Sequence, residues 1–441
     1  MIKSSVFTLY LSLLLLILHE SHALDPNAPE GFINAAYFQS WSQFNEGKAD
    51  REVFQPNMID PALITDLYYA FAIFGFITDS VDPGNARLTH DFTIQPLYAN
   101  EKAKFYPQIQ NLKKRSNGKL RLILSIGGEH FNNPDDPYGV GEKTYPLFSQ
   151  MVSSRSNRQE FIRSAIAYAH RYGFDGIDID WEFPGDSRTG GNASDFENFP
   201  IFLEECKQAF HSANPPLLLS CAAPAMIPEG VPKQYIDDPD LYYQWLAKCA
   251  KFLDRINIMA YNYHTPYNTL KLTGANAPLR EDTFSPSKLF IVNTLDNYLK
   301  HGIKAKKILL GIPLYGWVYD DVSNLSEQTG PGNPFTKPGD PAMLSYFEIA
   351  DLIFAKKFVL GSDQKTETAY AYNTKKKQWI SFDIPSTVEL KAREAKTRGL
   401  GGVIFWSIDQ DEYQWEPRFP NIRAPLDHKK NRLNVKNSIM W

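Results

Sequence analysis

The segment FDGIDIDWE at 174–182 contains the residues of this chain whose spacing best suits acid–base chemistry. Asp178, Asp180 and Glu182 are spaced by two, and a β-strand sends alternate side chains to the same face, so their carboxyl groups should line up on one side. At a rise of about 3.3 Å per residue, neighbours in this row lie about 6–7 Å apart. Because like charges this close disfavour full ionisation, at least one carboxyl should keep its proton near neutral pH. A retained proton is what a general acid needs.

The apolar residues between these carboxyl groups identify the segment as a buried strand. Ile177, Ile179 and Trp181 alternate with the acids, which is not typical of a solvated acidic edge. Similar short apolar runs recur along the chain with helical stretches between them. We expect strands at 33–38, 66–74, 120–126, 176–181, 217–222, 255–259, 308–312 and 402–406.

These runs predict parallel βα units, and eight such units close a barrel. The active site of such a barrel lies at the carboxyl ends of its strands, and Glu182 falls just past its own strand. One helix is clear from its apolar stripe, at 158–172, where Ser156 can cap the start and Gly173 the end.

A long gap separates the seventh and eighth expected strands. It holds roughly 90 residues, more than an ordinary crossover needs, and strand-like and helical segments occur within it at 344–356 and 368–379. Pro, Gly and Asn crowd residues 330–341, which predicts a loop there. We expect a small α+β insertion at 318–386.

The N-terminus predicts a secretory signal peptide at 1–23. Lys3 precedes an apolar run from Val6 to Leu18, and small residues up to Ala23 suit cleavage there. The alternative is an uncleaved anchor, but the run is shorter than the roughly 20 residues that a membrane span needs. We expect a secreted chain without membrane attachment, with the main domain at 24–423 and a polar basic tail at 424–441.

Charge and cysteine content exclude several classes of protein. The net charge is −4 and the pI is about 6.2, so the chain carries no basic footprint for nucleic acid. Its 3 cysteines are too few for a disulfide framework, and their odd number leaves at least one unpaired within the chain. Cys221 lies in an apolar run, which predicts a buried position. No spacing resembles a zinc site, and no cofactor is implied. The sequons at Asn192 and Asn324 predict glycan attachment.

The acidic segment fits the pattern Asp-x-x-Asp-x-Asp-x-Glu, which resembles the signature of glycoside hydrolase family 18, the chitinases. Other segments resemble the family in the same order along the chain: AYFQSW at 36–41, YAFA at 69–72, LSIGG at 124–128, APA at 223–225, NIMAYN at 257–262, LGIPLYG at 310–316 and GGVIFWS at 401–407. The resemblance implies a (β/α)8 TIM barrel with an insertion between strands 7 and 8. It also implies hydrolysis of β-1,4 links between N-acetylglucosamine units of chitin, with the substrate's acetamido group as nucleophile and net retention.

The same resemblance implies roles for the catalytic residues. Glu182 would protonate the glycosidic oxygen and later activate water, while Asp180 would accept a hydrogen bond from the acetamido N–H. Asp178 would share a proton with Asp180, and the Tyr261 hydroxyl would donate to the acetamido oxygen. Trp406 would lie beneath the sugar being cleaved, although it could instead cap the barrel interior. The remaining expected substrate contacts are Tyr37, Trp41, Phe71, Gly127, Gly128, Phe183, Met259 and Asn262.

Three positions depart from the family pattern. Asn262 stands where Asp is common, Glu129 where Trp is frequent and Trp317 where Arg is frequent. These departures concern subsite preference and the pH profile more than the reaction. Trp317 and Trp379 could line the substrate groove or pack within the insertion.

We expect a monomeric, endo-acting chitinase that binds chitin or chitooligosaccharides. A chitin-binding lectin on the same barrel is one alternative, although members that have lost catalysis usually lack the terminal Glu or middle Asp, and both Glu182 and Asp180 are present here. The other alternative is an endo-β-N-acetylglucosaminidase acting on N-glycans by the same mechanism.

Overall fold

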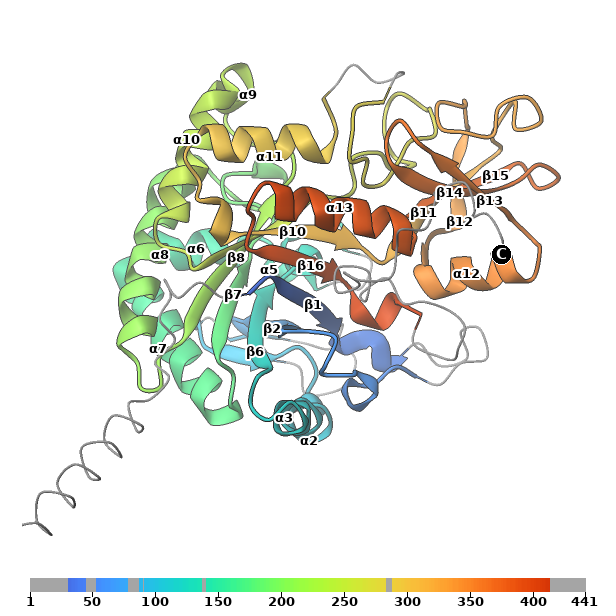
Figure 1. The fold of residues 1–441 in the computed structure, drawn as a ribbon. Coiled ribbons are helices and arrows are strands. Elements are labelled where there is room, and N and C mark those ends of the chain that lie inside the picture. Colours follow the sequence, from blue (N-terminus) through green and yellow to red (C-terminus); the bar gives the residue numbers. More distant parts are fainter. Residues whose placement is uncertain are drawn as a thin grey trace, which may run out of the picture.

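Parallel strands form a closed barrel in the computed structural model of the chain (Figure 1). The structure describes residues 31–44, 53–77, 87–89, 91–136, 140–282 and 288–412, so the expected signal peptide and basic tail lie outside the described residues. The barrel strands are β1 (Ile33–Gln39), β2 (Asp66–Phe74), β6 (Arg121–Gly127), β7 (Gly176–Asp180), β8 (Leu218–Pro224), β9 (Arg255–Met259), β10 (Ile308–Pro313) and β16 (Gly402–Trp406). Because β1 pairs with both β2 and β16, the sheet closes. All the expected strands are present, and the predicted TIM barrel is confirmed.

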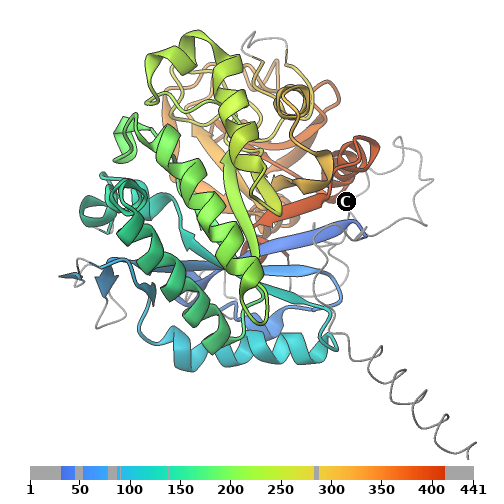
Figure 2. The ribbon, with the colours of Figure 1, turned by 90° about the vertical axis from the view of Figure 1, so that its left-hand side faces the viewer.

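Helices cover the outside of the barrel, as the turned view in Figure 2 shows. The longer ones are α3 (Tyr106–Arg115), α7 (Arg155–Tyr172), α8 (Asp195–Ser212), α10 (Pro239–Ala250), α11 (Ile291–Lys300) and α13 (Pro385–Thr397). Shorter helical pieces are η1 (Ser40–Phe44), η3 (Pro56–Met58), α2 (Glu101–Lys104), α4 (Glu129–Asn132), α5 (Gly141–Thr144), α6 (Leu147–Ser153), η5 (Ser187–Thr189), α9 (Lys233–Asp237), η6 (Ala305–Lys307) and η7 (Ile408–Gln410). Strand β5 (Ile94–Pro96) adds to β2 in antiparallel fashion, and β3 (Phe76–Ile77) pairs with β4 (Arg87–Leu88).

Helix α7, which precedes the acidic strand, starts earlier than the sequence predicted. The cap is Ser154 rather than Ser156, because the Ser154 hydroxyl accepts a hydrogen bond from the Asn157 N–H at 3.2 Å. The predicted end is correct: Gly173 adopts a left-handed conformation with φ 74°, which glycine tolerates best.

The alternation of β7 sets its two faces. Trp181, just past the strand, is fully buried among aromatic rings of the helical layer, stacked on Phe148 at 5.2 Å and edge-on to Phe199 at 5.5 Å. Ile177 and Ile179 belong to the same outer core. Since alternate side chains face opposite sides, the acidic residues are left facing the barrel interior.

The insertion is a five-stranded antiparallel sheet with one helix, in the order β12-β11-β15-β14-β13. Its elements are β11 (Tyr315–Asp320), β12 (Lys337–Ser345), α12 (Tyr346–Phe354), β13 (Val359–Asp363), β14 (Thr368–Asn373) and β15 (Gln378–Phe382). It lies on the side toward which the β1 and β16 arrows point (Figure 1). The sheet already begins at Tyr315 rather than at 318. The predicted loop at 330–341 is wrong from Lys337 onward, where β12 begins. This strand tolerates two prolines because it lies at the edge of the sheet and pairs only with β11.

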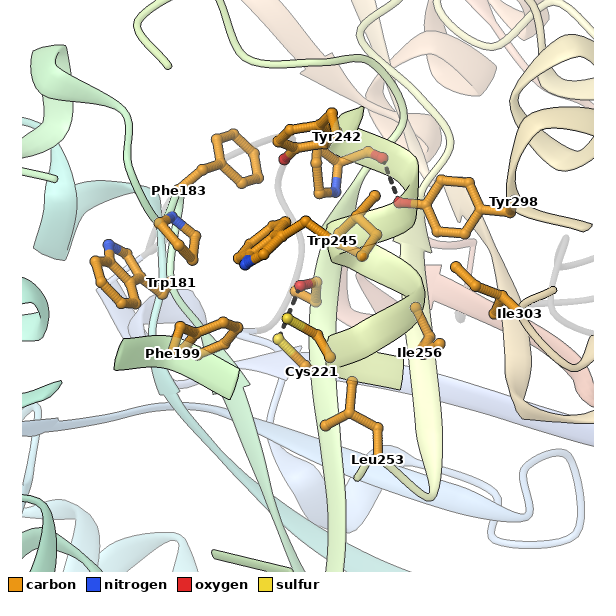
Figure 3. A pocket seen from close by; sticks show the side chains of 16 residues that line it. Trp181, Phe183, Phe199, Cys221, Tyr242, Trp245, Leu253, Ile256, Tyr298 and Ile303 are labelled. Carbon is orange, nitrogen blue, oxygen red and sulfur yellow. Dashed lines mark hydrogen bonds between the residues drawn. The ribbon is translucent and has the colours of Figure 1, made fainter. Parts of the chain in front are cut away.

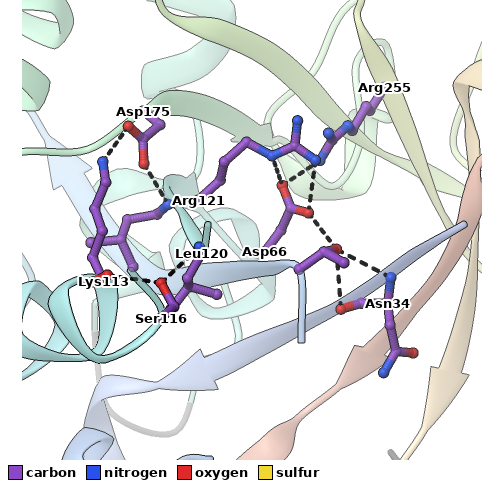
Figure 4. A network of polar contacts seen from close by, with 10 residues as sticks. Asn34, Asp66, Lys113, Ser116, Leu120, Arg121, Asp175 and Arg255 are labelled. Atoms are coloured by element: carbon purple, nitrogen blue, oxygen red, sulfur yellow. Dashed lines mark hydrogen bonds and ion pairs between the residues drawn. The ribbon is translucent and has the colours of Figure 1, made fainter. Parts of the chain in front are cut away.

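An ionic network ties together the amino ends of three barrel strands (Figure 4). Asp66 at the start of β2 accepts from Arg121 at 2.8 Å and also pairs with Arg255, the first residue of β9. Burial alone would raise the pKa of Asp66, but the two guanidinium groups more than offset it and the net shift is downward. This network lies at the end of the barrel opposite the carboxyl ends of the strands, where the active site is expected.

Replacing Asp66 with Asn should destabilise the fold by about 3–5 kcal/mol, because it removes the buried carboxylate that pairs with both Arg121 and Arg255. Urea denaturation of both proteins measures this loss. The stabilisation by Asp66 is present above its unfolded pKa and is lost as pH falls through the lower folded pKa, so the difference should narrow in acid. The matched control is Asp237→Asn, which removes an exposed i,i+4 pair with Lys233 and should cost less than about 1 kcal/mol. Equal effects of the two substitutions would contradict the prediction.

All three cysteines, Cys206, Cys221 and Cys249, are buried free thiols, which confirms the prediction for Cys221. Among the described helices none is both long and apolar enough to cross a membrane.

Candidate active site

Asp178 is held in the barrel interior by donors from four other strands. Its carboxylate accepts hydrogen bonds from the hydroxyls of Tyr37 (2.9 Å), Ser125 (2.8 Å) and Ser220 (2.6 Å) and from the Asn257 amide (3.1 Å). Burial raises the pKa of Asp178, and the three hydroxyl hydrogen bonds work against that rise. A carboxyl whose oxygens are this well supplied with donors is the member of the row best suited to carry negative charge.

Asp180 and Glu182 have much poorer hydrogen bonding. Asp180 is buried, and among the described residues its Oδ1 atom has no hydrogen-bond partner. Burial, then the charges of Asp178 and Glu129, raise the pKa of Asp180 well above its ordinary value. For Glu182, burial, Asp180 and Glu129 raise the pKa in the same way. The pKa values of all three carboxyls are raised, so the row should keep at least one proton near neutral pH, as the spacing predicted.

The loop after β6 is attached to the acidic segment on both sides of Glu129. The Gly128 N–H donates to the Asp180 carbonyl at 2.8 Å, and the Glu182 N–H donates to the Asn132 side-chain oxygen at 3.2 Å. A Cβ on Gly127 would lie 2.3 Å from the Asp180 carbonyl, and one on Gly128 would lie 2.4 Å from the Phe71 ring. Both glycines also have positive φ, 112° and 91°. Both glycines therefore allow the backbone of this loop to approach the acids, and their expected contact with substrate stays a prediction.

Four of the expected substrate residues form one aromatic cluster at the mouth of the barrel. Trp406 lies 5.7 Å from the Phe71 ring in a stacked arrangement, 6.2 Å from Trp41 and 5.2 Å from Tyr37. Trp406 and Trp41 are partly exposed, whereas Tyr37 and Phe71 are buried. The Tyr37 hydroxyl donates to Asp178, and contact of these four rings with substrate stays a prediction.

Tyr261 and Asn262 follow β9, whose last residue is the partly buried Met259. Burial, followed by Tyr315 and Glu182, raises the pKa of Tyr261 well above its ordinary value, so its hydroxyl remains a donor. Its ring lies over Gly311, where a Cβ would approach to 3.1 Å. Asn262 is exposed, with φ 61°, and its N–H donates to the Asn276 side chain at 2.8 Å.

Phe183 is the expected substrate residue that the structure does not place with the others. It lines a cavity of about 30 Å³ between the barrel and its helices, together with Trp181, Phe199 and Trp245 (Figure 3). This apolar space lies behind the acidic strand, in the layer of Cys221 and α10. Contact between Phe183 and substrate stays a prediction.

Sequence reasoning missed several positioning residues. Ser125, Ser220, Asn257 and Asn132 hold the acids, yet each is a common polar residue whose partner is distant in the sequence. Ser220 and Asn257 lie in the middle of their strands and Asn132 ends helix α4, so no local signal linked them to the acids. Trp379, which had two possible roles, is buried in the insertion and donates to the Thr329 carbonyl at 3.0 Å. Within the described residues, no group of His, Cys, Asp and Glu is arranged to hold a metal ion.

Comparisons with known proteins agree with this geometry. The domain described as glycosyl hydrolases family 18 matches residues 33–411. Chitotriosidase-1 of Mus musculus is 30% identical over 393 residues, covering 86% of this chain and 73% of that protein. Chitinase-3-like protein 2 of Homo sapiens is 30% identical over 392 residues, 86% of each chain. The structure of a Cycas revoluta GH18 chitinase mutant in complex with (GlcNAc)4 matches with a TM-score of 0.66 and 27% identity, covering 86% of this chain and 95% of that one. The matched region contains both the barrel and the acidic row, and the chain belongs to glycosyl hydrolase family 18.

Proposed function

We propose that this chain is a secreted chitinase that hydrolyses β-1,4 links between N-acetylglucosamine units by a retaining, substrate-assisted mechanism. The observation that carries the proposal is the graded row of acids on one strand. Asp178 is saturated with donors, whereas the buried Oδ1 of Asp180 has none among the described residues, and Glu182 lies at the rim. A similar protein supports this class of substrate, since the structure of the Cycas revoluta chitinase mutant contains bound (GlcNAc)4.

In the first step the glycosidic bond breaks. Glu182, protonated because its pKa is raised by burial and by Asp180, gives its proton to the leaving oxygen. The acetamido carbonyl oxygen of the substrate attacks the anomeric carbon and forms an oxazolinium-type ring. Asp180 accepts from the acetamido N–H through its unpartnered oxygen, and the Tyr261 hydroxyl donates to the acetamido oxygen.

In the second step water opens this ring. Glu182, now a carboxylate, takes a proton from a water molecule. This water attacks the anomeric carbon from the face that the leaving sugar has vacated. Two inversions give net retention. In the resting state Asp178 and Asp180 share a proton. During the reaction the Asp178 carboxylate stays fixed by its donors, while the Asp180 side chain turns from Asp178 to the substrate. Trp406 supports the sugar ring from below through its partly exposed indole.

Secretion, glycosylation, endo action and a monomeric state belong to the same proposal. Secretion rests on the leader at 1–23. Both sequon asparagines, Asn192 and Asn324, are exposed, as an attached glycan requires. The monomeric state rests on the candidate site residues, which all come from the barrel and insertion of one chain.

Product analysis on a chitin hexamer beside a high-mannose glycopeptide tests the proposed function. We expect cleavage of the hexamer, with internal products present early and β-anomers released first, and no cleavage of the glycopeptide. Early products restricted to dimers would contradict endo action. Cleavage of the glycopeptide would instead identify a glycoprotein-directed enzyme, and binding of the hexamer without products would identify a lectin.

A further inference from the structure

The loop after β6 brings a fourth carboxyl to the acidic row. Glu129 is the first residue of α4, at the carboxyl end of β6, where the active site of a barrel is expected. The loop is fixed on both sides of this residue. The Gly128 N–H donates to the Asp180 carbonyl at 2.8 Å, and the Asn132 side-chain oxygen accepts from the Glu182 N–H at 3.2 Å. Glu129 therefore cannot move away from the two outer acids unless these contacts break.

The Glu129 side chain is exposed, yet its charge acts on the acids. After burial and the neighbouring acid of the row, Glu129 is the next cause that raises the pKa of Asp180 and of Glu182. Burial also raises the pKa of Tyr315, a hydrogen bond with Asn276 opposes this rise, and the charge of Glu129 adds to it. Because Tyr315 belongs to the insertion and Glu129 to the barrel, the Glu129 carboxylate lies on the side of the loop that faces the site.

No positive charge of the protein neutralises Glu129 in the part of the chain that the structure describes. No lysine, arginine or histidine there forms an ion pair with it, and the neighbouring His130 pairs instead with Asp136 at 2.8 Å. Apart from burial, the causes that raise the pKa values of Asp180 and Glu182 are negative charges. Glu129 is therefore an exposed carboxylate beside the site, and its counter-charge has to come from outside the protein.

The residues around Asn262 add no charge to the other side of the site. The Asn262 side-chain oxygen accepts from the Trp317 indole N–H at 2.9 Å and from the Tyr315 hydroxyl at 2.6 Å. Two of the three departures from the family pattern, Asn262 and Trp317, thus form a neutral pair, whereas the third, Glu129, adds a negative charge. A positively charged group on the substrate should therefore be attracted to the side of the site formed by β6.

A free amine on a chitin chain would supply this positive charge. The buried Oδ1 of Asp180 has no partner among the described residues, which indicates that the space beside Glu129 receives a polar group. In the proposed mechanism this oxygen binds the acetamido group of the reacting sugar, so that sugar has to be acetylated. A neighbouring sugar has no such requirement. Without its acetyl group it carries a protonated amine at C2, which can pair with a carboxylate as a neutral N-acetylglucosamine unit cannot.

We propose that Glu129 selects partly deacetylated chitin by pairing its carboxylate with the ammonium group of a glucosamine unit next to the sugar being cleaved. The inference rests on the proposed function for the reaction and for the sugar polymer. It makes the preferred substrate a mixed, positively charged polymer instead of the fully acetylated one. Because the pair is exposed to solvent, its effect should be modest and should decrease as salt is added.

The test compares kcat/KM for chitohexaose with kcat/KM for hexamers that carry one glucosamine unit, whose position is varied across the set. In a mildly acidic buffer of low salt, the best mixed hexamer should be cleaved about five-fold more efficiently than chitohexaose. Glu129→Gln should bring this ratio to about one, and Glu129→Lys should invert it. The matched control is Glu204→Gln, which removes an exposed charge from α8 and should keep the wild-type ratio.

The outcomes separate the two proposals. If no mixed hexamer exceeds chitohexaose, or if Glu129→Gln leaves the ratio unchanged, the inference is wrong even though chitohexaose is cleaved. A ratio that does not respond to salt would also contradict a pairing of charges. Because the readout is a ratio, a variant that folds poorly lowers both rates and does not imitate the predicted change. If the wild-type protein cleaves none of the hexamers, the proposed function itself fails.

Discussion

Replacing Glu182 with Gln should lower kcat for chitooligosaccharide hydrolysis by roughly 10²–10⁴-fold while leaving substrate affinity nearly intact. Glutamine keeps the size and polarity of the side chain but cannot give a proton to the leaving oxygen or take one from water. The backbone anchor is unaffected, because Asn132 binds the Glu182 N–H rather than its carboxyl group. Initial rates with a fluorogenic chitobioside and calorimetric binding of chitohexaose measure the two effects separately.

The matched control for this prediction is Glu204→Gln, on the exposed face of helix α8, which should retain wild-type rates. The pH dependence gives an independent check. A general acid works only when protonated, so wild-type activity should fall as pH rises through the raised pKa of Glu182, and the residual activity of Glu182→Gln should lack that limb. Wild-type rates in Glu182→Gln would show that the acid has been wrongly assigned.

The acidic strand could be predicted from sequence because its information is local. A spacing of two, with Ile177 and Trp181 in between, fixes both faces of a strand without knowledge of its neighbours. The barrel strands were equally accessible, since buried parallel strands appear as short apolar runs. Their ends differ from the expected ones by no more than two residues.

What could not be predicted depends on contacts between distant segments. The donors around Asp178 come from β1, β6, β8 and β9, and no local pattern links Ser220 to Tyr37. The Asn262–Trp317 hydrogen bond is similar: each residue was visible as a departure from the family pattern, but their pairing required the insertion to fold back over the barrel. The helix cap was missed for a subtler reason, since Ser154 and Ser156 are equally good caps and only the backbone at Ser154, extended with ψ 150°, decides between them.

Replacing Asp180 with Asn should lower kcat by about 10²–10³-fold, the second largest effect that we expect. The amide can still accept from the acetamido N–H, but it carries no charge to stabilise the positive oxazolinium ring. It also cannot share a proton with Asp178. Steady-state kinetics on chitohexaose, with circular dichroism to verify folding, measures this loss.

The pH profile of Asp180→Asn distinguishes a chemical role from a merely structural one. The negative charge of Asp180 raises the pKa of Glu182, so its removal should lower that pKa and shift the alkaline limb of kcat/KM to lower pH. A structural defect would reduce activity at every pH without moving the limb. The proposed mechanism has the unpartnered Oδ1 of Asp180 accept from the acetamido N–H, so Asp180→Asn should also weaken the discrimination between acetylated and deacetylated oligomers. An unshifted limb and unchanged discrimination together would mean that Asp180 does not meet the reacting sugar.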